Sequence, residues 1–186
     1  MPELNLATIG AVMGAAVMGA AVLGVAGSAA AATVVVPMAL ATPTGPGAAI
    51  GSITATDTPA GVSFAMDLHG LPAGPHGFHV HTNPSCAPTT NAQGVVTPAG
   101  GAGGHLDPAM TNMHMGPAGM GHLGDLPLIV AAADGTSHDT VVAHHIASVA
   151  DLKGHALMIH AGGDNYADTP APLGGGGARL ACGVAG

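Results

Sequence analysis

Glycine and proline divide this chain into segments that are too short for long helices. The sequence holds 31 Gly and 15 Pro in 186 residues, and both residue types end or turn regular secondary structure. After residue 32, no segment keeps a 3.6-residue apolar period over three helical turns. The run 61–68 instead alternates, with Val62, Phe64, Met66 and Leu68 on one face. Such runs predict an all-β fold.

Eight segments have the composition and the length of β-strands. They span residues 34–41, 48–56, 61–68, 77–82, 126–133, 140–144, 155–161 and 178–184. Their spacing predicts an antiparallel sandwich or barrel. Two long segments between them, residues 83–125 and 162–177, do not resemble strands. Because loops of this length are uncommon in a compact domain, we expect both to be functional.

The side-chain composition limits both the core and the partners. Apolar residues make up 48% of the chain, yet it has no Trp, one Tyr and two Phe. The core must therefore consist mainly of aliphatic side chains and Met. Lys153 and Arg179 are the only cationic side chains, and the net charge is −8. Since nucleic-acid binding depends on clustered Lys and Arg, the composition predicts no nucleic-acid partner.

The first 32 residues differ from the rest of the chain. Residues 5–32 carry no charge and end in a run of small residues, which is typical of a signal peptide before its cleavage site. The segment before them contains Glu3 and no Lys or Arg, which is atypical. The same stretch is also long enough to span a bilayer. We therefore expect residues 1–32 to be a signal peptide, with a retained membrane anchor as the alternative, and residues 33–186 to form one periplasmic or secreted domain.

Seven side chains form a candidate set of metal ligands. Residues two apart on a strand project from the same face, so His79 and His81 can reach one ion. The first long loop and a later strand add five more candidates, His105, His114, His122, Asp125 and His160. Imidazole and carboxylate groups are common ligands of zinc, and imidazole is the commonest protein ligand of transition metals. Seven ligands exceed the needs of one tetrahedral site, which suggests two metal ions.

Five blocks of sequence together resemble bacterial Cu,Zn superoxide dismutases. They are residues 77–81 (GFHVH), 103–108 (GGHLDP), 121–127 (GHLGDLP), 156–165 (ALMIHAGGDN) and 174–183 (GGGGARLACG). The resemblance extends in order over nearly all of residues 33–186. It implies an eight-stranded antiparallel Greek-key β-barrel with two long functional loops, which agrees with the strand count above.

The resemblance also implies a role for each candidate residue. The copper positions are His79, His81, His105 and His160, and the zinc positions are His105, His114, His122 and Asp125. One copper and one zinc ion per chain would then share His105. Asp164 matches an aspartate that connects a copper-site His to a zinc-site His, and Arg179 matches the active-site arginine. Cys86 and Cys182, which on their own could be free thiols or a disulfide, match the disulfide of the family.

The implied activity is dismutation of superoxide to oxygen and hydrogen peroxide, with Arg179 orienting the anion and His105 carrying a proton. The alternative is a periplasmic copper or zinc buffer, or a copper-delivery module, on the same fold. A structural barrel with inert metals is a third interpretation. The complete ligand set favours the enzyme. A monomer and a homodimer are both compatible with the family, and a membrane partner is expected only if the N-terminal segment is retained.

Some His and Met side chains are left outside this set. His76 matches a His with a structural hydrogen-bonding role in the family. His144 and His145 are adjacent in a predicted strand and should face opposite ways, so we expect a surface pair. Four Met cluster around His114, at positions 110, 113, 115 and 120. Packing is the favoured interpretation of that cluster, and Cu(I) binding by thioether sulfur is the alternative.

Overall fold

The computed structural model describes Met1 and residues 30–186. The predicted signal peptide or anchor therefore lies almost wholly outside the described residues. Within the part that is described, no helix has the length and apolar character needed to cross a bilayer. Residues 31–186 form one compact unit, and all of the secondary structure discussed below belongs to it.

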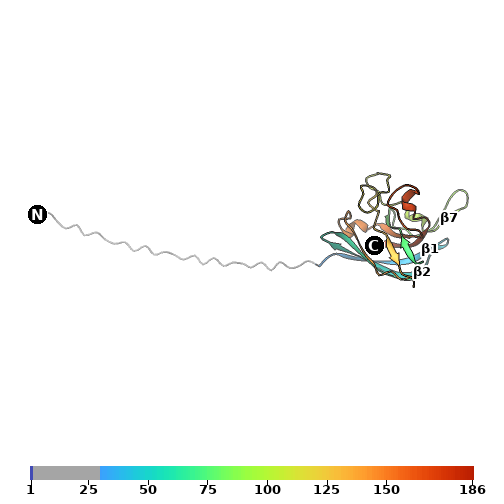
Figure 1. The fold of residues 1–186 in the computed structure, drawn as a ribbon, viewed down its shortest axis with the longest axis horizontal. Coiled ribbons are helices and arrows are strands. Elements are labelled where there is room, and N and C mark those ends of the chain that lie inside the picture. Colours follow the sequence, from blue (N-terminus) through green and yellow to red (C-terminus); the bar gives the residue numbers. More distant parts are fainter. Residues whose placement is uncertain (2–29) are drawn as a thin grey trace. The chain divides into compact units, whose positions relative to one another are not determined.

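Seven antiparallel strands form the main sheet (Figure 1). In spatial order they are β5 (Phe78–His81), β10 (His155–His160), β11 (Arg179–Ala185), β1 (Thr33–Thr42), β2 (Gly45–Thr58), β3 (Gly61–Leu68) and β9 (Thr140–Ala143). A second pair, β4 (Gly74–His76) and β8 (Ile129–Ala131), continues the fold beyond β5. With β4 and β5 taken as one strand bent at Gly77, eight strands form the barrel. The insertion of β10 and β11 between β5 and β1 makes the order a Greek key.

The eight predicted strands all have counterparts, and the differences lie in the connections. Residues 126–133 form only the three-residue strand β8, which pairs with β4 rather than with the main sheet. β4 was not predicted because Gly74 and Pro75 disfavour a strand, but an edge position tolerates Pro. β6 (Thr89–Thr90) and β7 (Val96–Thr97), which form a short hairpin inside the first long loop, were not predicted either. The Asn91 side chain accepts hydrogen bonds from two backbone N–H groups in the turn of that hairpin.

The core lies inside the barrel and is mainly aliphatic, as expected. The predicted inward face of β3 is buried along its whole length, at Val62, Phe64, Met66 and Leu68. The two Phe rings of the chain pack edge to face, with 5.4 Å between the centroids of Phe64 and Phe78. Because Phe78 immediately precedes the ligand strand segment His79–His81, this packing anchors the base of the site.

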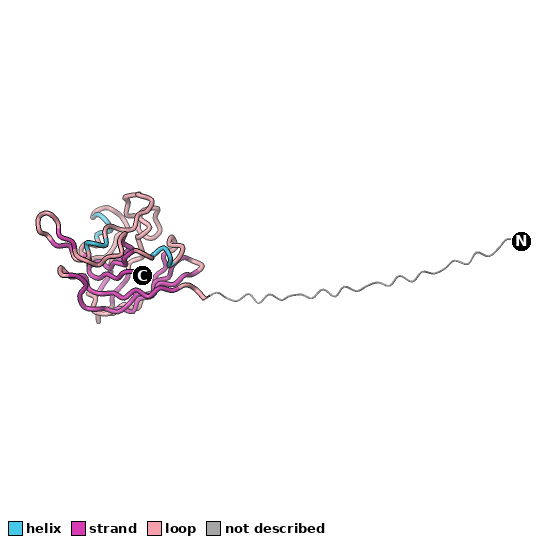
Figure 2. Tube along the Cα trace, turned by 180° about the vertical axis from the view of Figure 1, so that it is seen from behind, coloured by secondary structure: helices cyan, strands magenta, loops and turns pink. Residues whose placement is uncertain are grey.

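Two long connections cover one end of the barrel, as the loop segments in Figure 2 show. The first joins β5 to β8 and contains the β6–β7 hairpin and the short 3-10 helix η1 (Gly100–Ala102). The second joins β10 to β11 and contains η3 (Pro172–Gly175). A disulfide between Cys86 and Cys182 ties the first loop to β11 across a sequence separation of 96 residues. The remaining 3-10 helix, η2 (Val149–Leu152), precedes β10 and is capped by Ser148.

Candidate metal centre

The structure brings all seven predicted ligands together beneath the two long loops. His79 and His81 come from β5 and His160 from the end of β10, while the other four come from the first loop. Backbone bridges between His79 and Asp125, and between His81 and His105, hold that loop against β5. All seven side chains belong to buried residues. Rigid strands and a clamped loop therefore position the entire set.

One group of four imidazoles consists of His79, His81, His105 and His160, with ligand atoms within 4.8 Å of one another. The Nδ1 atom of His81 lies 2.9 Å from the carbonyl oxygen of Gly103, and that of His160 lies 3.2 Å from the carbonyl oxygen of Gly177. A carbonyl oxygen only accepts, so each Nδ1 carries the proton and each Nε2 presents a lone pair. These two Nε2 atoms face each other at 3.4 Å. Two lone pairs at this distance repel each other unless a cation lies between them.

Asp164 controls the orientation of two further rings. One carboxylate oxygen lies 2.8 Å from Nε2 of His79, and the other lies 2.8 Å from Nε2 of His114. Both rings thus donate from Nε2, which leaves their Nδ1 atoms as lone-pair donors. Both Nδ1 atoms are buried and lack a hydrogen bond of good geometry, although that of His114 lies 3.0 Å from a carboxylate oxygen of Asp125. Buried polar atoms are seldom left unpaired, so these two point to metal ligation.

A second group forms around Asp125. The Nδ1 atoms of His105, His114 and His122 lie 2.9, 3.0 and 3.2 Å from its Oδ1 atom. The four-residue set here whose ligand atoms all lie within 4.8 Å of one another is His79, His105, His114 and Asp125. His122 approaches the same carboxylate but stands outside that set. His79 and His105 belong to both groups, and the Nδ1 atom of His105 faces Asp125 while its other ring nitrogen is left for the first group.

Burial and nearby charge shift the pKa values of the His rings in opposite directions. Burial, together with neighbouring rings, lowers the pKa of His81 to about 2, of His160 to about 3 and of His105 to about 4. Burial also opposes a charge on His114, but the nearby carboxylates of Asp125 and Asp164 outweigh it and raise its pKa to about 9. The pKa of each of these two carboxyl groups is held below its usual range, because hydrogen bonds from the His rings exceed the effect of burial. At neutral pH the rings of His81, His105 and His160 thus stay uncharged, whereas His114 and the carboxylates of Asp125 and Asp164 are charged.

Arg179 begins β11 directly opposite His160, its partner in the strand register. Its guanidinium group donates to the carbonyl oxygens of Ala99 and Gly103. Gly103 also accepts from His81, so one carbonyl group holds both the arginine and a predicted ligand. Arg179 is half-buried, which leaves a fixed cation beside the first group.

Known proteins are similar in sequence to this chain over most of its length. The model of the family described as copper/zinc superoxide dismutase matches residues 49–185. The curated Cu-Zn superoxide dismutase of Brucella abortus is 52% identical over 154 residues, which is 83% of this chain and 88% of the relative. That of Escherichia coli is 52% identical over 156 residues, 84% of this chain and 90% of the relative.

The chain belongs to the copper/zinc superoxide dismutase family.

Solved structures agree with this assignment. The Cu/Zn superoxide dismutase from Brucella abortus superposes with a TM-score of 0.80 at 52% identity, covering 82% of this chain and 99% of that one. The monomeric copper, zinc superoxide dismutase from Salmonella enterica gives a TM-score of 0.76 at 48% identity, covering 83% and 100%. The Greek-key barrel expected from the sequence is therefore the fold of this superoxide dismutase family member.

The donor sets fit the two metals of the superoxide dismutase family. Four neutral imidazoles suit copper in both of its common oxidation states, because nitrogen ligands accept either. Three imidazoles and a carboxylate suit zinc, which prefers nitrogen, sulfur and carboxylate ligands in a tetrahedral arrangement. The Nδ1 atom of His79 belongs to both groups and that of His114 to the second, so each group contains a buried ring nitrogen without a hydrogen-bond partner.

Several residues that shape the site were not found from the sequence. Gly103 and Gly177 fix ring tautomers through their carbonyl groups, and Asp168 accepts a hydrogen bond from the backbone N–H of His114. Gly174 has φ +72°, and a Cβ atom on it would collide with Oδ1 of Asp164 and lie 2.7 Å from Nε2 of His114. The run of four Gly was part of the family signature, but its role in clearing space for Asp164 requires the tertiary structure.

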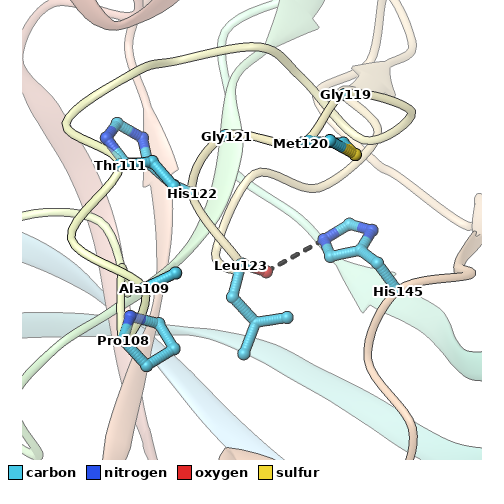
Figure 3. A pocket seen from close by; sticks show the side chains of 9 residues that line it. All are labelled: Pro108, Ala109, Thr111, Gly119, Met120, Gly121, His122, Leu123 and His145. Atoms are coloured by element: carbon cyan, nitrogen blue, oxygen red, sulfur yellow. Dashed lines mark hydrogen bonds between the residues drawn. The ribbon is translucent and has the colours of Figure 1, made fainter.

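The His residues outside the ligand set behave partly as expected. His76 is buried, and its two ring nitrogens lie 2.7 and 2.8 Å from the carbonyl oxygens of His160 and Pro72, which confirms a structural role. The expected surface pair is only half right. His144 is exposed, whereas His145 is half-buried and donates from Nε2 to the carbonyl oxygen of Leu123 (Figure 3). The strand ends at Ala143, so the pair lies in a turn rather than on a strand.

His145 lines a cavity of about 320 Å³ that His122 of the second group also lines (Figure 3). The cavity is mainly apolar and is bordered by His122 and Met120. The four clustered Met do not fill the core, so the expectation of packing was wrong. Their exposed fractions are 80% for Met110, 47% for Met113, 45% for Met115 and 87% for Met120.

Proposed function

We propose that this chain dismutates superoxide to oxygen and hydrogen peroxide, using one copper ion and one zinc ion. His79, His81, His105 and His160 would hold copper, and His105, His114, His122 and Asp125 would hold zinc. The observation that carries this proposal is the convergence of two donor groups that share His79 and His105, with the Nδ1 atom of His105 at 2.9 Å from Asp125. When bound, copper supplies the one-electron couple for the oxidation and the reduction of superoxide, and zinc supplies a fixed positive charge.

The protein's own residues bind the substrate and manage its protons. Arg179 binds the superoxide anion through guanidinium N–H groups that its two carbonyl contacts leave free. Those contacts, with Ala99 and Gly103, hold the guanidinium group in place before the anion arrives, so little reorganisation is needed. Asp164 keeps the protons of His79 and His114 on Nε2 and thereby maintains the ligand orientation.

His105 provides the proton store at the centre of the site. Its Nδ1 atom faces Asp125 at 2.9 Å, and its other ring nitrogen is left for the first group. That nitrogen can hold a proton beside the bound anion and release it to peroxide. Formation of hydrogen peroxide from the second superoxide consumes two protons, so one comes from His105 and one from solvent.

A matched pair of charge-removing variants tests this function. In the purified chain loaded with copper and zinc, Arg179→Ala should lower kcat/KM for superoxide by more than tenfold, about 1.4 kcal/mol in transition-state binding. Lys153→Ala removes the same charge before β10, at the opposite end of that strand from His160, and should change kcat/KM little. Tight binding of both metals without any dismutation would instead support a metal-buffering or delivery module.

We also propose that residues 33–186 work outside the cytoplasm as a monomer. The support is the long-range disulfide, which persists in oxidising compartments, and the apolar leader-like segment 5–32. The monomer follows the Salmonella relative, which is described as monomeric. Cell fractionation with intact-mass measurement distinguishes cleavage near residue 32 from a retained anchor. Light scattering at twice the monomer mass would contradict the monomer.

A further inference from the structure

The outer face of the loop that carries His114 and His122 presents thioether groups to solvent. Burial alternates along this segment, with Met113 and Met115 exposed and His114 and Gly116 buried. Met113 and Met115 therefore point outward on either side of an inward-pointing His114. By contrast, Met38, Met66 and Met158 are no more than 4% exposed. The side chains of Met113 and Met115 therefore contribute little to the packing of the core.

Met120 lies beside this pair. A Cβ atom on Gly119 would collide with Cβ of Met115, and one on Gly121 would lie 3.1 Å from it. The two residues that flank Met120 are thus in contact with Met115. The backbone N–H of His122 donates to the carbonyl oxygen of Met113 at 3.0 Å, which joins the two segments. Met120 also borders the cavity lined by His122 and His145 (Figure 3).

Charge and chemistry together select one class of ligand for these sulfur atoms. A thioether is a neutral, polarisable ligand that favours soft monovalent ions such as Cu(I) over zinc or Cu(II). The chain carries a net charge of −8 with only two cationic side chains, so its field attracts cations. One of those two, Arg179, is held against Ala99 and Gly103. Nothing in the sequence of residues 107–125 opposes the approach of a cation, since this stretch contains no Lys or Arg.

We propose that Met113, Met115 and Met120 form an outer thioether site that binds one Cu(I) ion on the solvent side of the loop. The site is distinct from the two inner groups, whose ligands are imidazole and carboxylate. Along the chain, Met113 and Met115 flank His114, and Met120 is two residues before His122. Copper held there in its reduced form is thus kept next to the loop that closes the metal centre.

Silver(I), a redox-inert soft cation, tests the site without any activity measurement. The full chain is labelled with ¹³C at the methionine methyl groups and saturated with zinc, which keeps it diamagnetic and blocks the inner ligands. Titration with silver should shift the methyl signals of Met113, Met115 and Met120 together and saturate at one ion per chain. The signals of the buried Met66 and Met158 should stay in place.

Two variants make the outcome decisive. Met113→Leu/Met115→Leu/Met120→Leu keeps apolar side chains of similar size and should weaken silver affinity by about 100-fold. Met110→Leu removes an equally exposed thioether from the same loop and should leave affinity unchanged. The proposal is overturned if all four exposed Met shift independently without saturation, or if the triple variant binds as tightly as the parent chain.

Discussion

The geometry of both groups of candidate ligands depends on the carboxylate of Asp164. It receives the Nε2 protons of His79 and His114 and so directs two unpaired Nδ1 atoms inward. Space for it exists only because residue 174 has no side chain. A Cβ atom at that position would collide with the carboxylate, and φ of +72° is itself unfavourable for other residues.

Gly174→Ala should therefore disturb the metal centre and not merely the loop. Gly175 offers a matched control, because its φ is +77° but a Cβ atom there would have Ala171 as its nearest neighbour, at 3.5 Å. We expect Gly174→Ala to weaken zinc retention by about tenfold or more, as displaced outer partners of ligands commonly do. Gly175→Ala should carry only the backbone cost of about 1 kcal/mol in stability. Zinc competition with a chromophoric chelator measures the first effect, and equal retention in the two variants would exclude the steric role.

At the scale of elements, one covalent link joins the first long loop to β11. The disulfide joins Cys86, in the first loop, to Cys182, only three residues after Arg179. The carbonyl groups that hold Arg179 belong to Ala99 and Gly103, in the same loop. The disulfide therefore keeps Arg179 close to the carbonyl groups that accept its hydrogen bonds.

Removal of this link should affect stability and substrate binding together. Cys86→Ser/Cys182→Ser opens a loop of nearly a hundred residues, which costs about 4–5 kcal/mol in the chain-entropy model. We expect a lower urea midpoint and a lower kcat/KM, because the loop that orients Arg179 is released. Unfolding curves of the parent chain with and without reductant give the control. An unchanged midpoint would show that the loop is held by its other contacts alone.

At the scale of the whole molecule, the charge distribution opposes the proposed substrate. Every acidic residue except Glu3 lies within residues 33–186, with only two cationic side chains to balance them. Added salt screens both the general repulsion of superoxide and the local attraction by Arg179, and the repulsion acts over the longer range. We expect kcat/KM to stay flat or to rise between about 10 and 150 mM salt. A steep decline, measured by pulse radiolysis, would show that attraction governs the encounter.

The stability of the metal-free protein should peak near neutral pH. Burial lowers the pKa values of His81, His160 and His105 from an ordinary 6.5 to about 2, 3 and 4. Below pH 6.5 the unfolded chain binds protons at these positions and the folded chain does not, so stability falls by up to about 1.4 kcal/mol per pH unit for each group. His114, with its pKa raised to about 9, has the opposite effect. It stabilises the fold fully below pH 6.5, and that contribution is lost as the pH rises towards 9.

Urea unfolding of chelator-treated protein at about pH 5, 6.5 and 8.5 measures the expected loss of stability on both the acid and the alkaline side of the maximum. Zinc-saturated protein is the control, since ligated imidazole cannot take up a proton until the metal leaves. A metal-free protein that is most stable at pH 5 would contradict the burial of these rings.

The sequence by itself determined the all-β class, the alternating face of β3 and the seven candidate ligands that the structure brings together. Periodicity and spacing are local properties, and a His-x-His pair on a strand has only one geometry. The tertiary structure decided which nitrogen of each ring is free, because the carbonyl groups of Gly103 and Gly177 and the carboxylate of Asp164 come from distant segments. It also decided that the clustered Met side chains are exposed. Hydrogen bonding and burial depend on which segments meet in space, and no local pattern of residues contains that information.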